Sequence, residues 1–525
     1  MATTSSPGPG PIAPIPFETA TATDVTKDGS DSENSASSLI PGEGEVAEEE
    51  NAEVVLGRIY RKLDRRIIPP FWTLYFLCAA IRSNIGLSLT MNLSEKHSLP
   101  ESLGLSSSQI SLSLALFYIT YILFDLPANL LMLSLPPHLC LSRIVILVGI
   151  IGSLHAALTA AWNFYLLRLL LGVVIAGMWP GMAYYISLFY PPQIAGRRIG
   201  MYFTAAQVSA AVGGLVSAGF QKMDGLGIGN GLEGWRWMVL VYGLLAVVDG
   251  IAILWWLPDR PDASTRPTTA SKSFWARLEH FIPTSPPALV GREAEMHLAH
   301  LRKTRKGGSW SMLDVGKIML DPTLYPMILM YLGVVGVGIG VQSFATIIIK
   351  SILPGLTSIQ LSLLAAPIWI CDLIAILLVT PLSDKYSRHR PVFFIVPALI
   401  QIAGLLLTTF AHNGWVRYAG LLVVGFGLGP TVPVTMALAS EDFNRRHGEV
   451  GVAAATAVVS GLGNIGSVIT TWGLYTGWKG DKERGYRGSN LVMCGMVGVS
   501  IVNAGWVWWR RMVRLRREEG VVDGR

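Results

Sequence analysis

The sequence predicts an all-α polytopic membrane protein with twelve transmembrane helices in two six-helix pseudo-symmetric bundles. Hydrophobic residues make up 51% of the 525 residues and charged residues only 14%, whereas soluble proteins carry about 25% charged residues. Apolar runs of about 20 residues, the length that spans a bilayer, recur along the chain. These runs fall into two groups of six on either side of a polar segment.

Composition divides the chain into five parts. Residues 1–57, rich in Pro, Gly, Ser and Thr and then in Glu, predict a disordered, water-exposed cytoplasmic tail. Residues 58–257 and 325–509 hold the two predicted bundles. Between them, residues 258–324 predict a cytoplasmic linker, in which REAEMHLAHLRKTRK has the spacing of an amphipathic helix near the membrane surface. Residues 510–525 form a short, basic cytoplasmic tail.

Each apolar run predicts one span. The six runs of the first bundle and the six of the second occupy these residues: 70–91, 109–133, 141–161, 164–188, 200–220 and 237–257, then 325–349, 359–382, 392–411, 417–438, 451–474 and 489–509.

Lys and Arg in the loops predict the orientation, because positively charged loops stay in the cytoplasm. Basic clusters precede the first run and follow the fourth, eighth, tenth and twelfth, which places them on one side. Residues 479–487 are an exception on the other side. We expect both termini in the cytoplasm and prefer the plasma membrane to the vacuolar membrane. Because the bases are dispersed, we expect no nucleic-acid partner.

Arg82 lies near the middle of the first run, in the stretch AIRSNIGLSL. A charge at this depth costs about 2.5–3.5 kcal/mol or more, so it must face a bundle interior, a water-filled cavity or a partner. Two interpretations stay open. Arg82 contacts an anionic substrate, with Asn84 beside it, since guanidinium matches carboxylate geometry; or it forms a structural ion pair, with Asp125 as the candidate partner.

Two lone acids stand in other apolar runs. Asp125 lies in FDLPANLLM, where Pro127 interrupts local backbone bonding, and Asp372 lies in IWICDLIAILL. Burial raises the pKa of a carboxyl group and a nearby cation lowers it. Both residues are therefore candidates for proton coupling or gating, with packing as the alternative.

Pro180 and Pro430 occupy comparable places in the fourth and tenth runs. Broken helices at matched positions in two halves indicate a central site in a transporter. Four further residues are candidate walls of that site, with packing or lipid contact as the alternative: Trp179, Tyr184, Gln342 and Trp369.

Other kinds of site receive no support from the sequence. No His, Cys or acidic cluster has metal-ligand spacing, and no nucleophile motif occurs, so we expect no metal, no cofactor and no enzyme. Asn92 opens an Asn-Leu-Ser sequon and is a weak candidate for glycosylation. The expected partners are a small-molecule substrate and the lipid bilayer, with a monomeric protein.

The chain resembles the major facilitator superfamily in two motifs. The stretch PLSDKYSRHRP is similar to the superfamily's loop between the eighth and ninth spans, and RLLLGVVIAG is similar to its Arg-x-x-x-Gly pattern in the fourth span. The resemblance implies transport by alternating access and a cytoplasmic latch at the loop. The matching residues are Arg168 and Gly172 in the span, and Asp384, Lys385, Arg388 and Arg390 in the loop.

Within the superfamily, the first half resembles the fungal anion:cation symporters, the allantoate permease-like group. The similar stretches are RSNIG, LPANLL, AGMWPGMAYYISLFY, GWRW and REAEMHLAHLR. The resemblance implies transport of a small organic anion or carboxylated metabolite, such as allantoate, nicotinate or pantothenate, commonly with protons. Ile81 and Ile175 stand where that group usually has acids. Efflux of a fungal secondary metabolite is the alternative function, and a nutrient receptor without transport is a more distant one.

Overall fold

The structure is a computed structural model whose described residues fall into two compact units, Met1–Val54 and Val55–Arg525. Only a helical stretch from residue 43 is described in the first unit. The described residues are 43–227, 231–261, 287–304, 312–478, 480–481 and 483–522.

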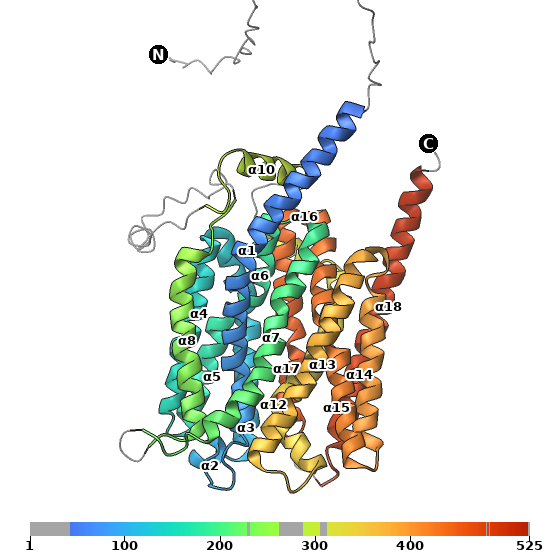
Figure 1. Ribbon diagram of the computed structural model, residues 1–525. Coiled ribbons are helices and arrows are strands. Elements are labelled where there is room, and N and C mark those ends of the chain that lie inside the picture. The colour runs from blue at the N-terminus through green and yellow to red at the C-terminus, as the bar shows by residue number, and fades with distance from the viewer. Residues whose placement is uncertain are drawn as a thin grey trace, which may run out of the picture. The chain divides into compact units, whose positions relative to one another are not determined.

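The second unit is a bundle of long helices (Figure 1). Eleven helical segments of the described chain are long and apolar enough to cross a membrane. The first predicted span lies in α1 (Glu43–Ser88) of the same bundle, and it completes the twelve predicted spans. The all-α class is confirmed, since the described residues contain helices and a single isolated bridge, between Leu226 and Leu232.

The spans of the first half are built from seven helices: α1, α3 (Ser107–Ser134), α4 (Pro137–Leu154), α5 (Ala161–Ile175), α6 (Met178–Phe189), α7 (Pro192–Gln221) and α8 (Gly234–Trp256). Those of the second half are built from α12 (Leu324–Ile352), α13 (Ser358–Lys385), α14 (Val392–Phe410), α15 (Gly414–Leu428), α16 (Thr431–Gly463), α17 (Ile465–Val468), the π-helix η4 (Ile469–Gly473) and α18 (Arg487–Val522). Short helices connect them: α2 (Leu99–Ser102), η1 (His155–Ala157), α10 (Arg292–Thr304), α11 (Met312–Met319) and η3 (Ser387–His389).

The second span of each half begins with the same local motif. Ser106 and Gln109 exchange hydrogen bonds of 2.9 and 3.3 Å at the start of α3. Thr357 and Gln360 exchange bonds of 2.9 and 3.3 Å at the start of α13. Such a capping box satisfies two backbone N–H groups that a helix start leaves open. The repeated start supports the predicted pseudo-symmetry of the halves.

The fourth and tenth spans are both interrupted, as the prolines predicted. In the fourth span, α5 ends at Ile175 and α6 begins at Met178, with Gly177 between them at φ +77°. In the tenth, α15 ends at Leu428 and α16 begins after Pro430. Pro180 lies within the first turn of α6, where the missing proline N–H leaves no intrahelical bond unmade.

Glycines allow helices to approach closely in both halves. A Cβ atom on Gly149 of α4 would lie 2.6 Å from the carbonyl oxygen of Gly243 in α8. A Cβ atom on Gly404 of α14 would lie 2.8 Å from the carbonyl oxygen of Gly420 in α15. Small residues at helix interfaces are expected in membranes, where van der Waals packing drives helix association.

Two predicted tails are helical over most of their described length. The first was expected to be disordered as far as residue 57, but α1 begins at Glu43. Its first residues, EGEVAEEENAEVV, include Glu and Ala, which are strong helix formers. The basic residues after 509 continue α18 to Val522, and two of them, Arg511 and Arg514, form ion pairs with α16.

The amphipathic segment of the linker forms α10, which packs against the first half. Glu293 pairs with Lys62 of α1 at 2.6 Å, and His300 Nδ1 lies 2.8 Å from the Tyr60 hydroxyl. His297 Nε2 lies 2.8 Å from the carbonyl oxygen of Phe189, at the end of α6. These contacts hold α10 on protein surface, and its position near the membrane surface stays a prediction. We call this side of the bundle the linker side (Figure 1).

Asn92 lies beyond α1 on the opposite side. Its side chain is 7% exposed, and its amide nitrogen donates a 3.1 Å hydrogen bond to the carbonyl oxygen of Gln221. A glycan is attached through this nitrogen, so the observed geometry gives the predicted glycosylation no support.

We predict that Gly177→Ala lowers the thermal stability of the purified protein. The substitution places a Cβ atom at positive φ, which costs of order 1–3 kcal/mol, and that atom would also lie 2.7 Å from the Ala128 Cβ. Melting curves in detergent measure the effect. The matched control is Gly219→Ala in α7, where nothing lies within 4 Å of the added atom. Equal melting temperatures for the two variants would contradict the strain at Gly177.

Candidate functional site

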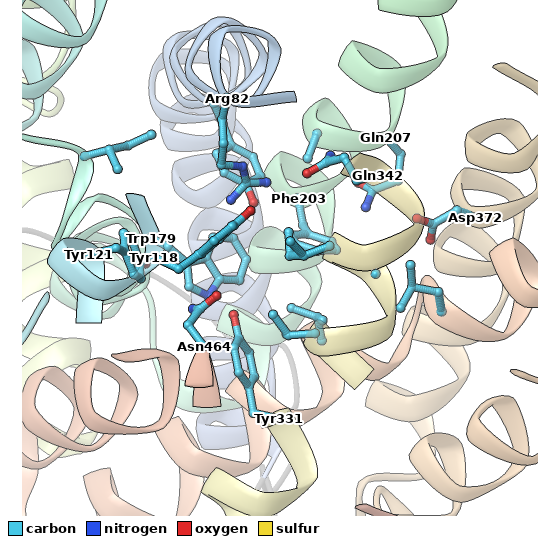
Figure 2. Close-up of a pocket in the computed structure, with 18 of the residues that line it drawn as sticks. Arg82, Tyr118, Tyr121, Trp179, Phe203, Gln207, Tyr331, Gln342, Asp372 and Asn464 are labelled. Atoms are coloured by element: carbon cyan, nitrogen blue, oxygen red, sulfur yellow. The ribbon is translucent and has the colours of Figure 1, made fainter. Parts of the chain in front are cut away.

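A central cavity lies between the two halves. The space between its walls measures about 850 Å³, open solvent included. Helices from both halves line it (Figure 2). Its described lining residues with aromatic or polar side chains are Tyr75, Arg82, Phe117, Tyr118, Tyr121, Trp179, Phe203, Gln207, Tyr331, Gln342, Trp369, Asp372 and Asn464.

The first half contributes an aromatic wall. Trp179 of α6 stacks on Tyr75 of α1, with ring centroids 5.4 Å apart, and its ring centroid lies 5.0 Å from that of Phe203 in α7. Tyr118 and Tyr121 add two more rings from α3. Such a wall offers a large apolar contact to a ligand and keeps hydroxyl groups available for hydrogen bonds.

Arg82 is the one cation among the described lining residues. α1 carries it to the cavity (Figure 2), and its Nε has no hydrogen-bond partner. The predicted alternative, an ion pair with Asp125, is wrong, because the described ion pairs do not include it. Arg82 therefore presents its charge to the space between the halves.

Three predicted wall residues, Trp179, Gln342 and Trp369, line the cavity. Asn84 and Tyr184 do not belong to its lining, although both are buried. The Asn84 side chain instead lies beside Gly213 of α7, where an added Cβ atom would come within 3.0 Å of its oxygen.

Asp125 of α3 packs beside the break in the fourth span, and it lies outside the cavity lining. Its Oδ1 accepts a 2.8 Å hydrogen bond from the backbone N–H of Gly177, while its Oδ2 is buried without a partner. Gly461 of α16 lies close to the carboxyl group, since an added Cβ atom would be 3.5 Å from Oδ2. Asp125 thus joins the helix break to the seam between the halves.

Asp372 of α13 packs beside the corresponding break in the tenth span, and it lines the cavity. Its side chain is fully buried, and neither carboxyl oxygen has a hydrogen-bond partner within the described chain. Gly429 leaves it room, because an added Cβ atom there would collide with the Asp372 carboxyl group. The two lone acids of the sequence therefore occupy related places with different surroundings.

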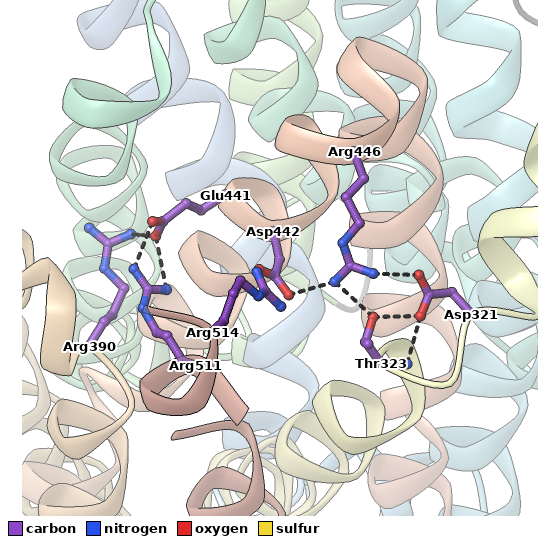
Figure 3. Close-up of polar contacts among 8 residues, drawn as sticks. All are labelled: Asp321, Thr323, Arg390, Glu441, Asp442, Arg446, Arg511 and Arg514. Carbon is purple, nitrogen blue, oxygen red and sulfur yellow. Dashed lines mark hydrogen bonds and ion pairs between the residues drawn. The ribbon is translucent and has the colours of Figure 1, made fainter. Parts of the chain in front are cut away.

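Ion pairs tie helices of the second half together on the linker side (Figure 3). Arg390 pairs with Asp384 of α13 at 2.8 Å and with Glu441 of α16 at 3.2 Å. Arg511 of α18 pairs with the same glutamate at 2.8 Å. Of the predicted latch residues, Asp384 and Arg390 are joined in this network. Lys385 and Arg388 are exposed.

A second set of charges continues the network toward α11. Arg446 pairs with Asp442 at 2.9 Å and with Asp321 at 2.7 Å, and Arg514 pairs with Asp442 at 2.8 Å. Burial alone would raise the pKa of Asp321, but hydrogen bonds from Thr323 and the charge of Arg446 hold it below its ordinary value. Asp321 is therefore ionised, as the pair requires.

The latch acid Asp384 also meets the first half. An added Cβ atom on Gly196, near the start of α7, would lie 2.7 Å from Asp384 Oδ1. The start of a helix carries a partial positive charge, so a carboxylate is stabilised there. Asp384 thus connects α13 to α7 across the seam between the halves.

The halves touch on both sides of the cavity. On the linker side, Asn129 of α3 donates a 2.5 Å hydrogen bond to the carbonyl oxygen of Ala453 in α16. On the opposite side, Ser111 lies 2.6 Å from Thr476, and Gln221 donates a 3.3 Å bond to Ser362. The cavity is thus bordered by contacts between the halves at either end.

The sequence interpretation missed several lining residues, above all Gln207, Asn464 and the tyrosines Tyr75, Tyr118 and Tyr331. A usable signal existed, because tyrosine in membrane proteins concentrates at the two interfaces and not at mid-depth. A phenol or amide in the middle of an apolar run needs a partner or water, as Arg82 does.

These features define a polytopic membrane transporter with a central site between two bundles. The family model of the major facilitator superfamily matches residues 71–471 and 355–521. The chain belongs to the major facilitator superfamily.

Relatives and solved structures agree with this class. The chain is 45% identical to an uncharacterized transporter of Schizosaccharomyces pombe, over 85% of this chain and 71% of the relative. It is 43% identical to vitamin H transporter 1 of the same yeast, over 88% and 82%, and 26% identical to a putative tartrate transporter of Agrobacterium vitis, over 85% and 90%. The fold is similar to that of a proton:xylose symporter, at 16% identity and a TM-score of 0.61, over 83% and 95%.

We predict that Glu441→Ala destabilises the linker side. The substitution leaves Arg390 and Arg511 without their shared carboxylate, and each lost charged hydrogen bond contributes about 1.5–3 kcal/mol. Melting curves of the purified protein measure the loss. Glu95→Ala, at an exposed glutamate on the opposite side, is the control and leaves the curve unchanged. A Glu441→Ala protein as stable as this control would contradict a stabilising network.

Proposed function

We propose that this protein is a secondary active transporter that moves a small organic anion or carboxylated metabolite by alternating access. The observation that carries the proposal is the position of Arg82, which faces an aromatic-walled cavity between the two halves. A guanidinium kept at this depth without a carboxylate partner is suited to a ligand that supplies one.

The names of similar proteins support an anionic substrate. One relative is named for vitamin H and another for tartrate, and both compounds are carboxylates. Together with the resemblance in the first half, these names favour the allantoate permease-like group for this chain. The aromatic wall would then contact the body of the substrate, while Arg82 binds its carboxylate.

Alternating access requires contacts that break on one side while they hold on the other. Asp384 and Arg390, joined with Glu441 and Arg511, form the latch in this proposal. They hold Asp384 against Gly196 of the first half, and this contact keeps the linker side closed until the halves rock. Exposed Lys385 and Arg388 contribute positive charge at the same loop, and this loop is cytoplasmic by the positive-inside rule. Both termini then lie in the cytoplasm, with the protein in the plasma membrane as a monomer.

Proton coupling is assigned to the buried carboxyl groups of Asp125 and Asp372. Asp125 is the stronger candidate for linking a proton to movement, because it touches both the helix break at Gly177 and the seam at Gly461. Losing or gaining a proton there changes the charge at a contact that must rearrange when the halves rock.

Efflux of a secondary metabolite is the second candidate function. It is favoured by the aromatic wall, which suits a larger apolar ligand as well as a small acid. Counterflow in proteoliposomes separates the two candidates, because labelled carboxylates accumulate only if the protein exchanges them. Accumulation of no carboxylate at all would overturn the anion proposal.

We predict that Arg82→Ala weakens carboxylate uptake by about 10- to 100-fold, the loss of one charged hydrogen-bonded contact. Arg82→Lys retains the charge but loses the bidentate geometry of the guanidinium group, so its uptake rate lies between those of Arg82→Ala and the wild-type protein. The measurement is initial uptake of labelled carboxylates into proteoliposomes. Arg65→Ala changes an exposed arginine on the same helix and leaves uptake unchanged. Full uptake by Arg82→Ala would remove the anion role.

We predict that an imposed inward proton gradient accelerates uptake by the wild-type protein. Asp125→Asn keeps an oxygen that accepts from the Gly177 N–H but cannot ionise, so it abolishes the response to the gradient while substrate exchange continues. Uptake with and without a gradient, beside counterflow at equal pH, measures both properties. A wild-type rate that ignores the gradient would exclude proton coupling.

A further inference from the structure

The cavity holds a second ionisable group, and this group does not pair with Arg82. Asp372 and Arg82 both line it, yet the described ion pairs do not join them. Figure 2 shows them on different sides of the cavity, with the amides of Gln207 and Gln342 between them in this view.

The Asp372 carboxyl group is a buried hydrogen-bond acceptor that receives no hydrogen bond. Its side chain has no exposed surface, and both of its oxygens lack a hydrogen-bond partner. The carbonyl oxygen of Gln207, which is 6% exposed, also lacks one. Leaving such groups buried and unsatisfied costs about 1–3 kcal/mol each, and more when the group is charged. These acceptors would be satisfied by donors that a ligand brings.

We propose that the cavity recognises a bipolar substrate, with a carboxylate bound at Arg82 and an N–H donor bound at Asp372 and Gln207. This inference rests on the proposed function and narrows its substrate class. The ligand carries an amide, ureido or ammonium N–H at a distance from its carboxylate, and its middle lies on the aromatic wall. A dicarboxylate without hydrogen-bond donors fits poorly, because it leaves the Asp372 and Gln207 oxygens unsatisfied.

The arrangement separates the roles of the two buried acids. Asp372 lies in the cavity lining and touches the ligand directly. Asp125 lies outside that lining and its Oδ1 already accepts from the Gly177 N–H. A ligand donor can therefore reach Asp372 but not Asp125.

The experiment compares ligands that differ in one pole. The probes are vitamin H, pantothenate and allantoate, which carry a carboxylate and N–H donors, and pentanoate, succinate and nicotinate, which carry carboxylates without an N–H donor. The methyl ester of vitamin H keeps the donors and loses the anion. Binding to the purified full-length protein is measured by calorimetry. We expect at least one donor-bearing acid to bind about 10-fold or more tighter than every acid without a donor.

Variants then assign each pole. Asp372→Asn replaces one of the two acceptor oxygens with an NH2 donor, so it lowers the preference for the donor-bearing acid and leaves binding of the donor-free acids unchanged. If the wild-type protein prefers vitamin H, Arg82→Gln removes its preference for vitamin H over the methyl ester. If it prefers another acid, Arg82→Gln weakens the binding of every acid. Asp249→Asn, at a half-buried acid of α8 outside the cavity lining, is the matched control and changes neither preference.

Two failures are distinguishable. If acids bind but those with N–H donors have no advantage, or if the advantage is undiminished in Asp372→Asn, the bipolar site is overturned and the anion transporter stands. If no carboxylate binds the wild-type protein, the proposed function falls and this inference with it. Should Asp372→Asn fail to fold, the comparison of ligands on the wild-type protein still decides the preference.

Discussion

The structure depends on how the charge of Arg82 is kept inside a membrane-spanning bundle. A cation at this depth is costly in hydrocarbon, so α1 must turn it away from lipid. It faces a cavity that exists only because two six-helix halves meet around it. Since no described carboxylate pairs with it, the charge is free to organise the chemistry of that space. Trp179, Tyr75 and Phe203 line the rest with rings that tolerate both water and an apolar ligand.

The two helix breaks lie at related positions in the two halves, but the acids beside them make different contacts. Each half interrupts a span beside a buried carboxyl group, at Gly177 with Asp125 and at Gly429 with Asp372. In the first half the acid accepts from the freed backbone N–H, as membrane proteins require of broken helices. In the second half the acid turns its unsatisfied oxygens to the cavity. The repeat thus keeps the geometry of the site while its polar chemistry diverges.

The two sides of the cavity are closed by different kinds of contact. On the linker side, the contacts between the halves include a carboxylate: Asp384 lies against Gly196 of α7, beside the hydrogen bond from Asn129 to the carbonyl oxygen of Ala453. Water can solvate this carboxylate once the halves separate, so a closure of this kind can open reversibly. On the opposite side, neutral contacts dominate: Ser111 meets Thr476, and Gly86 packs against the backbone of Gln342.

The sequence by itself determined the order and approximate position of the spans, the helix breaks and the unusual position of Arg82, because each follows from the local cost of polar groups in lipid. It also indicated Asp384 and Arg390, which the structure joins in an ion pair. Only the tertiary structure decided which side chains meet at the cavity. Residues two apart on a helix point about 200° apart, so Arg82 lines the cavity while Asn84 lies against Gly213. The rotation of each helix about its axis is set by packing between distant segments, and composition alone does not encode it.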